Sequence, residues 1–417
     1  MFARILNYMI REGSIRWIDG GGRSHLIGDG GSPCCTVRLK RRSLDWTLLL
    51  NPGLRVPEAY MNGDLEMVEG TFHDLISVAS ANYHWLEGHP LYRVMGWFDP
   101  ARLGQYNPMG RARRNVAHHY DLSDALYRLF LDGDRQYSCA YFQDGVDDLD
   151  EAQHAKKRHI AAKLRLEPGQ KVLDIGSGWG GLGLYLAEAG GVDVTGLTLS
   201  VEQHGVSNRR VEEAGLDDRA RFRLQDYREE TGVYDRIVSV GMFEHVGRRH
   251  YDEFFAKIRE ILAPGGVMLL HSIGRLDTPA PINAFIRKYI FPGADLPAMS
   301  EVLRTVEPTG LYVTDIEVLR LHYAETLRLW RERFMARRAE AAAIYDERFV
   351  RMWEAYFSIC EAGFRNQHLM VFQMQIARGM EALPLTRDYM LDWERGQAGA
   401  EADASAGERG LRKRSAA

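Results

Sequence analysis

A short apolar run that ends in a glycine-rich turn constrains the fold of this chain more than any other feature. Val172–Ile175 leads into Gly176-Ser177-Gly178-Trp179-Gly180-Gly181, and a helical pattern follows. Glycines let a backbone turn tightly and approach a ligand closely at the carboxyl end of a strand. Further apolar runs alternate with helical patterns after this turn, which indicates a parallel sheet covered by helices.

This alternation predicts an α/β fold with a doubly wound, Rossmann-like sheet of about seven strands. A helical region of roughly residues 323–363 separates the last two strands. The expected strands are Lys171–Ile175, Val192–Leu197, Ala220–Gln225, Asp235–Val240, Val267–Ser272, Leu311–Leu319 and Leu369–Ile376.

The chain divides into three parts. We expect residues 1–110 to form a smaller α+β domain, with strands at Ile15–Ile18 and Cys35–Leu39. The turn-rich stretch Asp99–Arg114 has the composition of a linker. Residues 111–395 form the main domain. Residues 396–417 are rich in Ala, Gly, Glu and Ser without apolar periodicity, and we expect a disordered tail there.

Composition excludes several classes of protein. The 417 residues carry a formal net charge of -4, so the whole molecule has no attraction for nucleic acid. No apolar run approaches the ~20 residues that a transmembrane helix needs, and we expect a cytoplasmic protein. The four cysteines lack zinc-site spacing, so neither disulfides nor a metal are expected.

Spacing around the glycine-rich turn decides between cofactors. A nicotinamide site needs an acidic residue about 20 positions later, but Gly196–Ser200 contains none, and the lysine of a phosphate-binding loop is absent too. Asp174, Asp226 and Glu244 instead follow three of the expected strands, so they would meet in one crevice. The alternative is that they are solvated loop acids.

Several stretches, in order along roughly residues 115–375, carry a narrower resemblance. The sequence resembles the cyclopropane fatty acid synthase and mycolic acid methyltransferase family. The stretches are HYDL at 119–122, YSCAY at 137–141, residues 173–181, LTLS at 197–200 with Glu202 and Gln203, EHVG at 244–247, HSIG at 271–274, YIFPG at 289–293 and HYAETL at 322–327. Glu58–Asp64 also resembles the small lipid-engaging domain of the bacterial synthases.

The resemblance implies a methyltransferase that uses S-adenosylmethionine. In such enzymes the positions of Asp174, Asp226 and Glu244 face the methionine amino group, the adenine amine and the methyl-transfer centre. The implied cofactor-binding residues are Tyr137, Ser138, Asp174, Gly176, Gly178, Trp179, Gly180, Thr198, Leu199, Ser200, Gln203, Gln225, Asp226 and Tyr227.

The resemblance further implies attack of an alkene on the sulfonium methyl group, which builds a carbocation before a proton leaves. Aromatic faces stabilise cations, and Tyr137, Phe243 and Tyr323 are the candidates. In the family the base is a bicarbonate ion. Here it would be held by the Cys139 region, Glu244, His271, Tyr323 and the backbone of Ile273.

Each of these side chains also has a plainer interpretation. Cys139 could be a small buried apolar residue, His271 a hydrogen-bonded core histidine, and Tyr323 a packing residue. Aromatic residues at helical spacing between 330 and 357 could line an acyl tunnel or pack as core. They are Trp330, Phe334, Tyr345, Phe349, Trp353, Tyr356 and Phe357.

The expected substrate is an unsaturated phospholipid, met by a protein bound peripherally to the inner face of the membrane. Two basic clusters could contact anionic headgroups or form a solvated face: Arg111, Arg113 and Arg114, and Lys156–Arg158. A homodimer is left open. Two alternatives to ring formation remain. The enzyme could methylate the alkene to give a methyl-branched or methylene chain, or the protein could bind lipid without catalysis.

Overall fold

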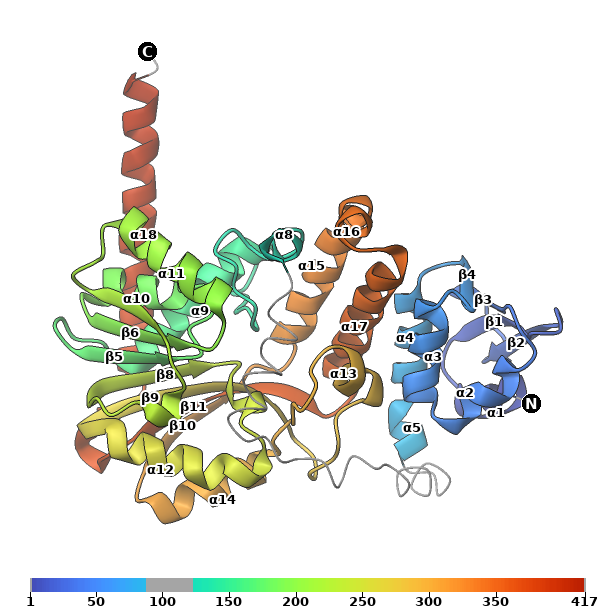
Figure 1. Cartoon of the computed structure of the whole chain (residues 1–417), viewed down its shortest axis with the longest axis horizontal. Coiled ribbons are helices and arrows are strands. Elements are labelled where there is room, and N and C mark those ends of the chain that lie inside the picture. Colours follow the sequence, from blue (N-terminus) through green and yellow to red (C-terminus); the bar gives the residue numbers. More distant parts are fainter. Residues whose placement is uncertain (1, 88–122, 416–417) are drawn as a thin grey trace.

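A computed structural model describes residues 2–87 and 123–415. A small N-terminal domain and a larger sheet domain lie at opposite ends of the molecule, with a group of helices that includes α15 and α17 between them (Figure 1). The expected linker, with Arg111, Arg113 and Arg114, and the HYDL stretch at 119–122 lie outside the described residues.

The N-terminal domain is built on a four-stranded sheet of order β2-β1-β3-β4. β1 and β3 are parallel and correspond to the two expected strands, while β2 and β4 were missed. The elements are α1 (Phe2–Met9), β1 (Ser14–Ile18), β2 (Ser24–Gly28), β3 (Cys35–Leu39), α2 (Leu44–Leu50), α3 (Pro52–Met61), β4 (Leu65–Glu69), α4 (Phe72–Ala81) and α5 (Tyr83–Glu87).

The main sheet has seven strands in the order β10-β11-β9-β8-β5-β6-β7, which confirms the predicted doubly wound sheet. The first five strands of this domain are parallel, and β11 is antiparallel to both of its neighbours. The strands are β5 (Lys171–Ile175), β6 (Asp193–Thr198), β7 (Ala220–Leu224), β8 (Tyr234–Val240), β9 (Leu262–Arg275), β10 (Tyr312–Val318) and β11 (Leu369–Ala377).

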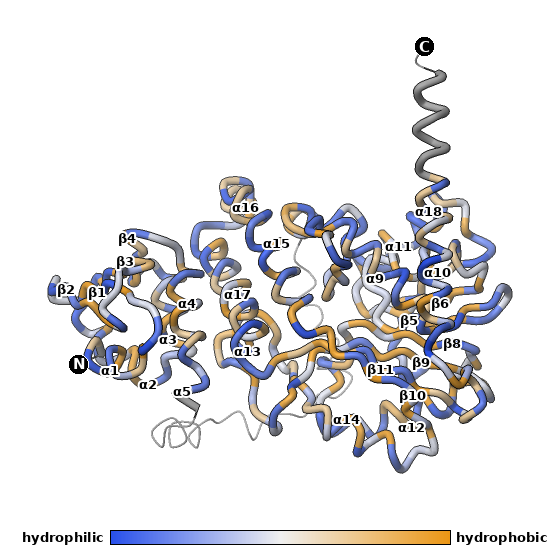
Figure 2. Tube along the Cα trace, turned by 180° about the vertical axis from the view of Figure 1, so that it is seen from behind, coloured by the Kyte–Doolittle hydropathy of each residue, from blue (hydrophilic) through white to orange (hydrophobic). Residues whose placement is uncertain are grey.

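Helices cover both faces of this sheet (Figure 1). α9 (Leu149–Leu164), α10 (Gly181–Gly190) and α11 (Val201–Ala214) lie on one face, and α12 (Tyr251–Ile261) and α14 (Met299–Val306) on the other. The strands between these layers are largely hydrophobic (Figure 2), because a parallel sheet is buried on both faces. The order of the strands reverses at β5, where such folds bind ligands.

The expected helical region between β10 and β11 consists of α15 (His322–Ala336), α16 (Arg338–Ile344) and α17 (Glu347–Asn366). α17 packs against α3 and α4 of the N-terminal domain. The described part of the main domain also contains the short helices α8 (Asp124–Tyr127) and α13 (Ala284–Tyr289).

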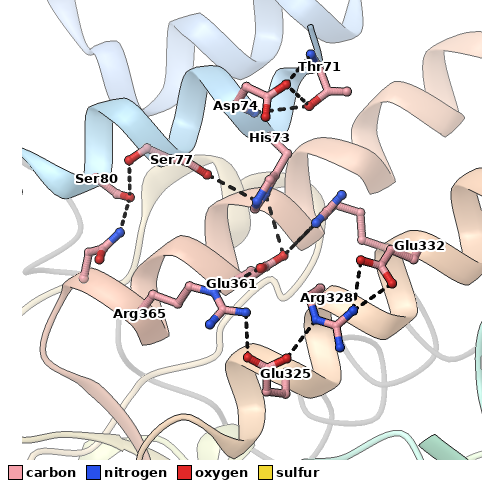
Figure 3. Close-up of polar contacts among 12 residues, drawn as sticks. Thr71, His73, Asp74, Ser77, Ser80, Glu325, Arg328, Glu332, Glu361 and Arg365 are labelled. Atoms are coloured by element: carbon pink, nitrogen blue, oxygen red, sulfur yellow. Dashed lines mark hydrogen bonds and ion pairs between the residues drawn. The ribbon is translucent and has the colours of Figure 1, made fainter. Parts of the chain in front are cut away.

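A polar network joins α4 to α15 and α17 (Figure 3). Glu361 of α17 is 2% exposed and pairs with Arg365 at 3.1 Å, while His73 Nδ1 of α4 lies 3.7 Å from the same carboxylate. Asn366 Nδ2 donates to Ser80 Oγ at 2.8 Å. Buried charges need such partners, so this network fixes how the two domains meet.

The expected disordered tail is wrong for the residues that the structure describes. α18 (Asp388–Ser415) continues through Gly396 as a helix. Glu401 accepts hydrogen bonds from Arg158 at 2.6 Å and Tyr185 at 2.7 Å, which hold the helix on α9 and α10. Ala and Glu favour helix, and composition alone did not reveal these partners. Among the described residues, no helix is long and apolar enough to span a bilayer.

Candidate active site

Two neighbouring cavities open at the carboxyl ends of the parallel strands, and we name them the cofactor pocket and the apolar cavity. The cofactor pocket lies around the turns that follow β5, β6, β7 and β8. It is lined by every predicted cofactor residue except Gly180 and Ser200. Those two cap helices instead: Gly180 precedes α10 with φ 85°, and Ser200 accepts from the Gln203 amide before α11.

The glycine-rich turn shapes the floor of this pocket. Gly176 has φ +83°, and a Cβ there would lie 2.8 Å from Met242 Cβ. Gly178 has φ +54°, and a Cβ there would meet no atom within 4 Å. Both positions therefore favour glycine for its conformation, and at Gly178 the absent side chain leaves room for a ligand.

Asp174 is the buried acid of the cofactor pocket. It is 2% exposed, and its Oδ2 has no hydrogen-bond partner in the described structure. Burial raises the pKa of this carboxyl to about 7, against the opposing charge of Lys156. A buried carboxylate without a partner is costly, and a cationic amine would satisfy it. These residues therefore fit S-adenosylmethionine with its amino group at Asp174.

Asp226 is also buried in this pocket, but its carboxylate is already bound. Arg228 donates to the two Asp226 oxygens at 2.9 and 2.7 Å, and both residues line the pocket. Asp226 is therefore not a solvated loop acid. The resemblance did not predict that Arg228 lines the cofactor pocket. It also did not predict four further lining residues: Arg135, Gln136, Met242 and His245.

The apolar cavity brings together all six predicted catalytic residues. It is lined by Tyr137, Cys139, Glu244, His271, Ile273 and Tyr323, among other side chains. Tyr137, Ser138, Gly241 and His245 line both cavities and form a shared wall. A substrate in the apolar cavity would therefore lie next to a ligand in the cofactor pocket.

Glu244 presents one free carboxyl oxygen within this site. Its Oε1 accepts a hydrogen bond from the Ile273 amide at 2.6 Å, whereas its buried Oε2 has no partner in the described structure. Burial raises the pKa of this carboxyl to about 7. In this structure the Ile273 amide therefore holds Glu244, where the resemblance implied contact with a bound anion.

The neighbouring groups are neutral. Burial raises the pKa of the Cys139 thiol and lowers the pKa of His271 well below its usual value. Tyr137 Oη lies 2.9 Å from Tyr356 Oη, and its ring stacks on Trp330 at 5.1 Å. A set of neutral donors around one buried acid can bind a small anion or stabilise developing charge.

The family follows from sequence comparison. The sequence model of the family described as Mycolic acid cyclopropane synthetase matches residues 108–374. The chain belongs to this family. It is 38% identical over 357 residues to the cyclopropane-fatty-acyl-phospholipid synthase of Escherichia coli K12, which covers 85% of this chain and 91% of the relative.

Other members of the cyclopropane synthetase family agree. Tuberculostearic acid methyltransferase UfaA1 of Mycobacterium tuberculosis is 39% identical and covers 77% of this chain and 78% of the relative. The solved structure of the cyclopropane synthase MmaA2 of Mycobacterium tuberculosis aligns with a TM-score of 0.62 at 36% identity, over 66% of this chain and 100% of that one. The chain is therefore an S-adenosylmethionine-dependent C-methyltransferase.

The third aromatic candidate for the cation-stabilising site, Phe243, is wrong. Its ring is fully buried, stacks on Tyr251 at 4.4 Å and lines neither cavity. Strand-end position alone did not reveal that its side chain points into the core beneath the sheet. Of the seven helical aromatics, Tyr356 lines the apolar cavity. Trp330, Phe334, Trp353 and Phe357 are core, Phe349 packs half-buried against that core, and Tyr345 is exposed.

The basic cluster Lys156–Arg158 does not face a membrane. All three side chains are buried in α9. Lys157 pairs with Asp134 at 2.7 Å, Arg158 with Glu401 at 2.6 Å, and Lys156 donates to Gln136 and Ser138. Each cation has a partner inside the fold. The sequence shows only that three basic residues are adjacent and does not show these partners.

Proposed function

We propose that this protein transfers the methyl carbon of S-adenosylmethionine to the cis double bond of an unsaturated phospholipid acyl chain, where it becomes the methylene carbon of a cyclopropane ring. The observation that carries this proposal is the apolar cavity that shares a wall with the cofactor pocket and contains the unpartnered oxygen of Glu244. The E. coli relative, named for this reaction, supports the phospholipid substrate.

When bound in the cofactor pocket, S-adenosylmethionine would supply an electrophilic methyl group. One alkene carbon would bond to that methyl carbon as the bond between the methyl carbon and sulfur breaks, which would leave a cation on the other alkene carbon. The rings of Tyr137 and Tyr323, which line this mostly apolar cavity, would stabilise the cation. Loss of a proton from the added methyl group lets its C–H electrons close the ring.

We infer that a bound bicarbonate ion takes this proton. Glu244, whose pKa is about 7, can donate from Oε2 when protonated. The Tyr323 hydroxyl and the Cys139 thiol, which donates to the Ala140 carbonyl in this structure, line the same cavity and could turn toward the ion. The described side chains of the cavity include no group that is both unprotonated and strongly basic at neutral pH. Activity should therefore fall when dissolved carbon dioxide is removed and return when bicarbonate is added. Full activity in degassed buffer would contradict this inference.

A second outcome is a methyl-branched or methylene chain, formed when the cation loses a different proton. The similarity to a relative named a tuberculostearic acid methyltransferase is the reason to consider this second product. Mass spectrometry of membrane lipids, with and without expression of the chain, tests the transfer, and NMR of the purified lipid distinguishes a ring from a branch. Unchanged lipids would favour the non-catalytic rival.

We also propose that residues 1–110 bind the inner face of the membrane and present its lipids. α1 and α2 lie against each other and expose Ile5, Tyr8, Trp46 and Leu50. Aromatic and aliphatic side chains of this kind enter the interfacial region of a bilayer. A homodimer would place two such faces on one membrane.

Flotation with phosphatidylethanolamine and phosphatidylglycerol vesicles tests this membrane face. Trp46→Ser with Leu50→Ser should reduce the bound fraction, while S-adenosylmethionine binding stays intact. Leu385→Ser is the matched control, because Leu385 is fully exposed but lies before α18, far along the chain from this face. Equal loss in both variants, or none, would contradict the proposal.

A further inference from the structure

A buried series of hydrogen bonds leads from His271, at the apolar cavity, to Lys163 of α9, which packs on the same face of the sheet. His271 on β9 and Gln373 on β11 are directly opposite each other in the antiparallel pair. Gln373 Nε2 lies 3.2 Å from His271 Nδ1, and Lys163 Nζ of α9 lies 2.7 Å from Gln373 Oε1. None of the three residues is more than 2% exposed, so water cannot substitute for these contacts.

The donor properties of these groups allow only one arrangement. A lysine ammonium group can only donate, so the atom of Gln373 that faces Lys163 must be the amide oxygen. The amide nitrogen then faces His271, and because it too can only donate, Nδ1 must accept. A neutral imidazole that accepts at one nitrogen carries its proton on the other.

The ends of this series of hydrogen bonds are also fixed. Lys163 forms an ion pair with Glu317, whose carboxylate also binds His159 Nε2 at 2.7 Å. That carboxylate opposes the lowering of the Lys163 pKa by burial. At the other end, burial and the nearby Lys156 and Lys163 cations lower the pKa of His271, so its ring is neutral.

We propose that Lys163 and Gln373 are positioning residues that hold His271 as the Nε2–H tautomer, so that His271 donates a hydrogen bond into the apolar cavity. His271 lines this cavity, and with Nδ1 committed to Gln373 its Nε2 is the nitrogen that remains for a bound group. A protonated Nε2 cannot take the proton that closes the ring. The inference rests on the proposed function for its chemistry, and it assigns His271 to holding the base.

Histidine-selective ¹³C labelling and NMR test the tautomer without any lipid. The ring-carbon shifts separate the two neutral forms, and the missing signal in His271→Gln identifies His271. We expect the Nε2–H form in the wild-type protein. In Gln373→Glu we expect the Nδ1–H form or the imidazolium, because a carboxylate can only accept. An Nδ1–H or charged His271 in the wild type would overturn the proposal.

Turnover supplies the second measurement. Gln373→Glu should lower kcat about 100-fold, the effect of removing one donor from a dry site, while the Kd for S-adenosylmethionine stays unchanged. Gln375→Glu is the matched control. Gln375 is equally buried on the same face of β11, but it donates to the Lys163 carbonyl and to Tyr389 and lines neither cavity.

The control variant should turn over at nearly the wild-type rate, with melting temperatures checked for both. Equal loss of kcat in both variants at equal stability would overturn the positioning role. If the wild-type protein shows no turnover of lipid, the proposed function fails, yet the tautomer measurement still decides this inference.

Discussion

The cofactor pocket and the apolar cavity share a wall but are built in different ways. The cofactor pocket is lined by residues 135–246, largely the turns that follow successive strands. The apolar cavity collects side chains from residues 137–371, including α13, α15 and α17. A pocket made of strand-end turns is specified by local sequence, whereas a cavity made of distant helices is specified by how the whole domain packs. Substitutions should therefore separate cofactor binding from turnover.

The largest effect is expected at Gly178. Gly178→Val should lower the affinity for S-adenosylmethionine more than about 100-fold, because φ +54° disfavours a branched residue and the side chain would enter the cofactor pocket. Calorimetry measures the affinity. Gly169→Val is the control. Gly169 also has a positive φ, +83°, and a Cβ there would meet no atom within 4 Å, but Gly169 lines neither cavity. Undiminished affinity in Gly178→Val would remove the cofactor from this turn.

A substitution at Glu244, which lines the apolar cavity, tests whether turnover can be lost without loss of cofactor binding. Glu244→Leu should lower kcat about 100-fold or more, because it removes the donor at Oε2, while cofactor affinity stays near wild type. Product formation on vesicles and calorimetry give the two values. Glu260→Leu, on the exposed side of α12, is the control. Loss of cofactor binding in Glu244→Leu would show that the two cavities are not separable.

The cofactor pocket should respond to pH. The pKa of Asp174 is about 7 in the free protein, so below that value a proton must be displaced before the carboxylate can pair with an amine. Affinity for S-adenosylmethionine should fall about tenfold between pH 8 and pH 6. In Asp174→Asn this dependence should vanish and affinity should be low throughout. Affinity that is flat with pH in the wild type would contradict the pairing.

The smallest effect is expected at Cys139. Its buried thiol stays neutral, and a serine hydroxyl can still donate, so Cys139→Ser should cost less than about tenfold in kcat. Cys360→Ser, the other thiol that lines the apolar cavity, is the comparison, and both rates come from the vesicle assay. A loss above 100-fold at Cys139 alone would indicate that the sulfur itself takes part.

The sheet and the cofactor pocket could be predicted because their signals are local. The strand-turn-helix at 172–189 predicted the position of the turn, and the apolar runs predicted all seven strands. Burial on both faces leaves a nearly continuous hydrophobic pattern in central strands such as β5 and β11, whereas the edge strands β7 and β10 are partly exposed. β2 and β4 were missed because their burial is mixed: Leu26 and Val68 are exposed. Short strands of this kind carry little periodicity.

Side-chain partners could not be predicted. The charge run Lys156–Arg158 looks solvated in the sequence, and only the fold brings Asp134 and Glu401 to it. Phe243 follows a strand like its neighbours, yet its ring turns into the core. Gln373 belongs to no recognisable sequence motif. Its contact with His271 follows only from the pairing of β11 with β9, which places the two residues opposite each other.

The shared wall limits which parts of this protein can be altered independently. Tyr137 and Ser138 face both chambers, and α9 holds their segment because Gln153 donates to the Ser138 carbonyl and Lys156 to its hydroxyl. A change there would disturb both chambers at once. Ile286 and Phe364 line only the far side of the apolar cavity. An engineer who wants a different chain length or double-bond position should vary those helices first and leave the wall unaltered.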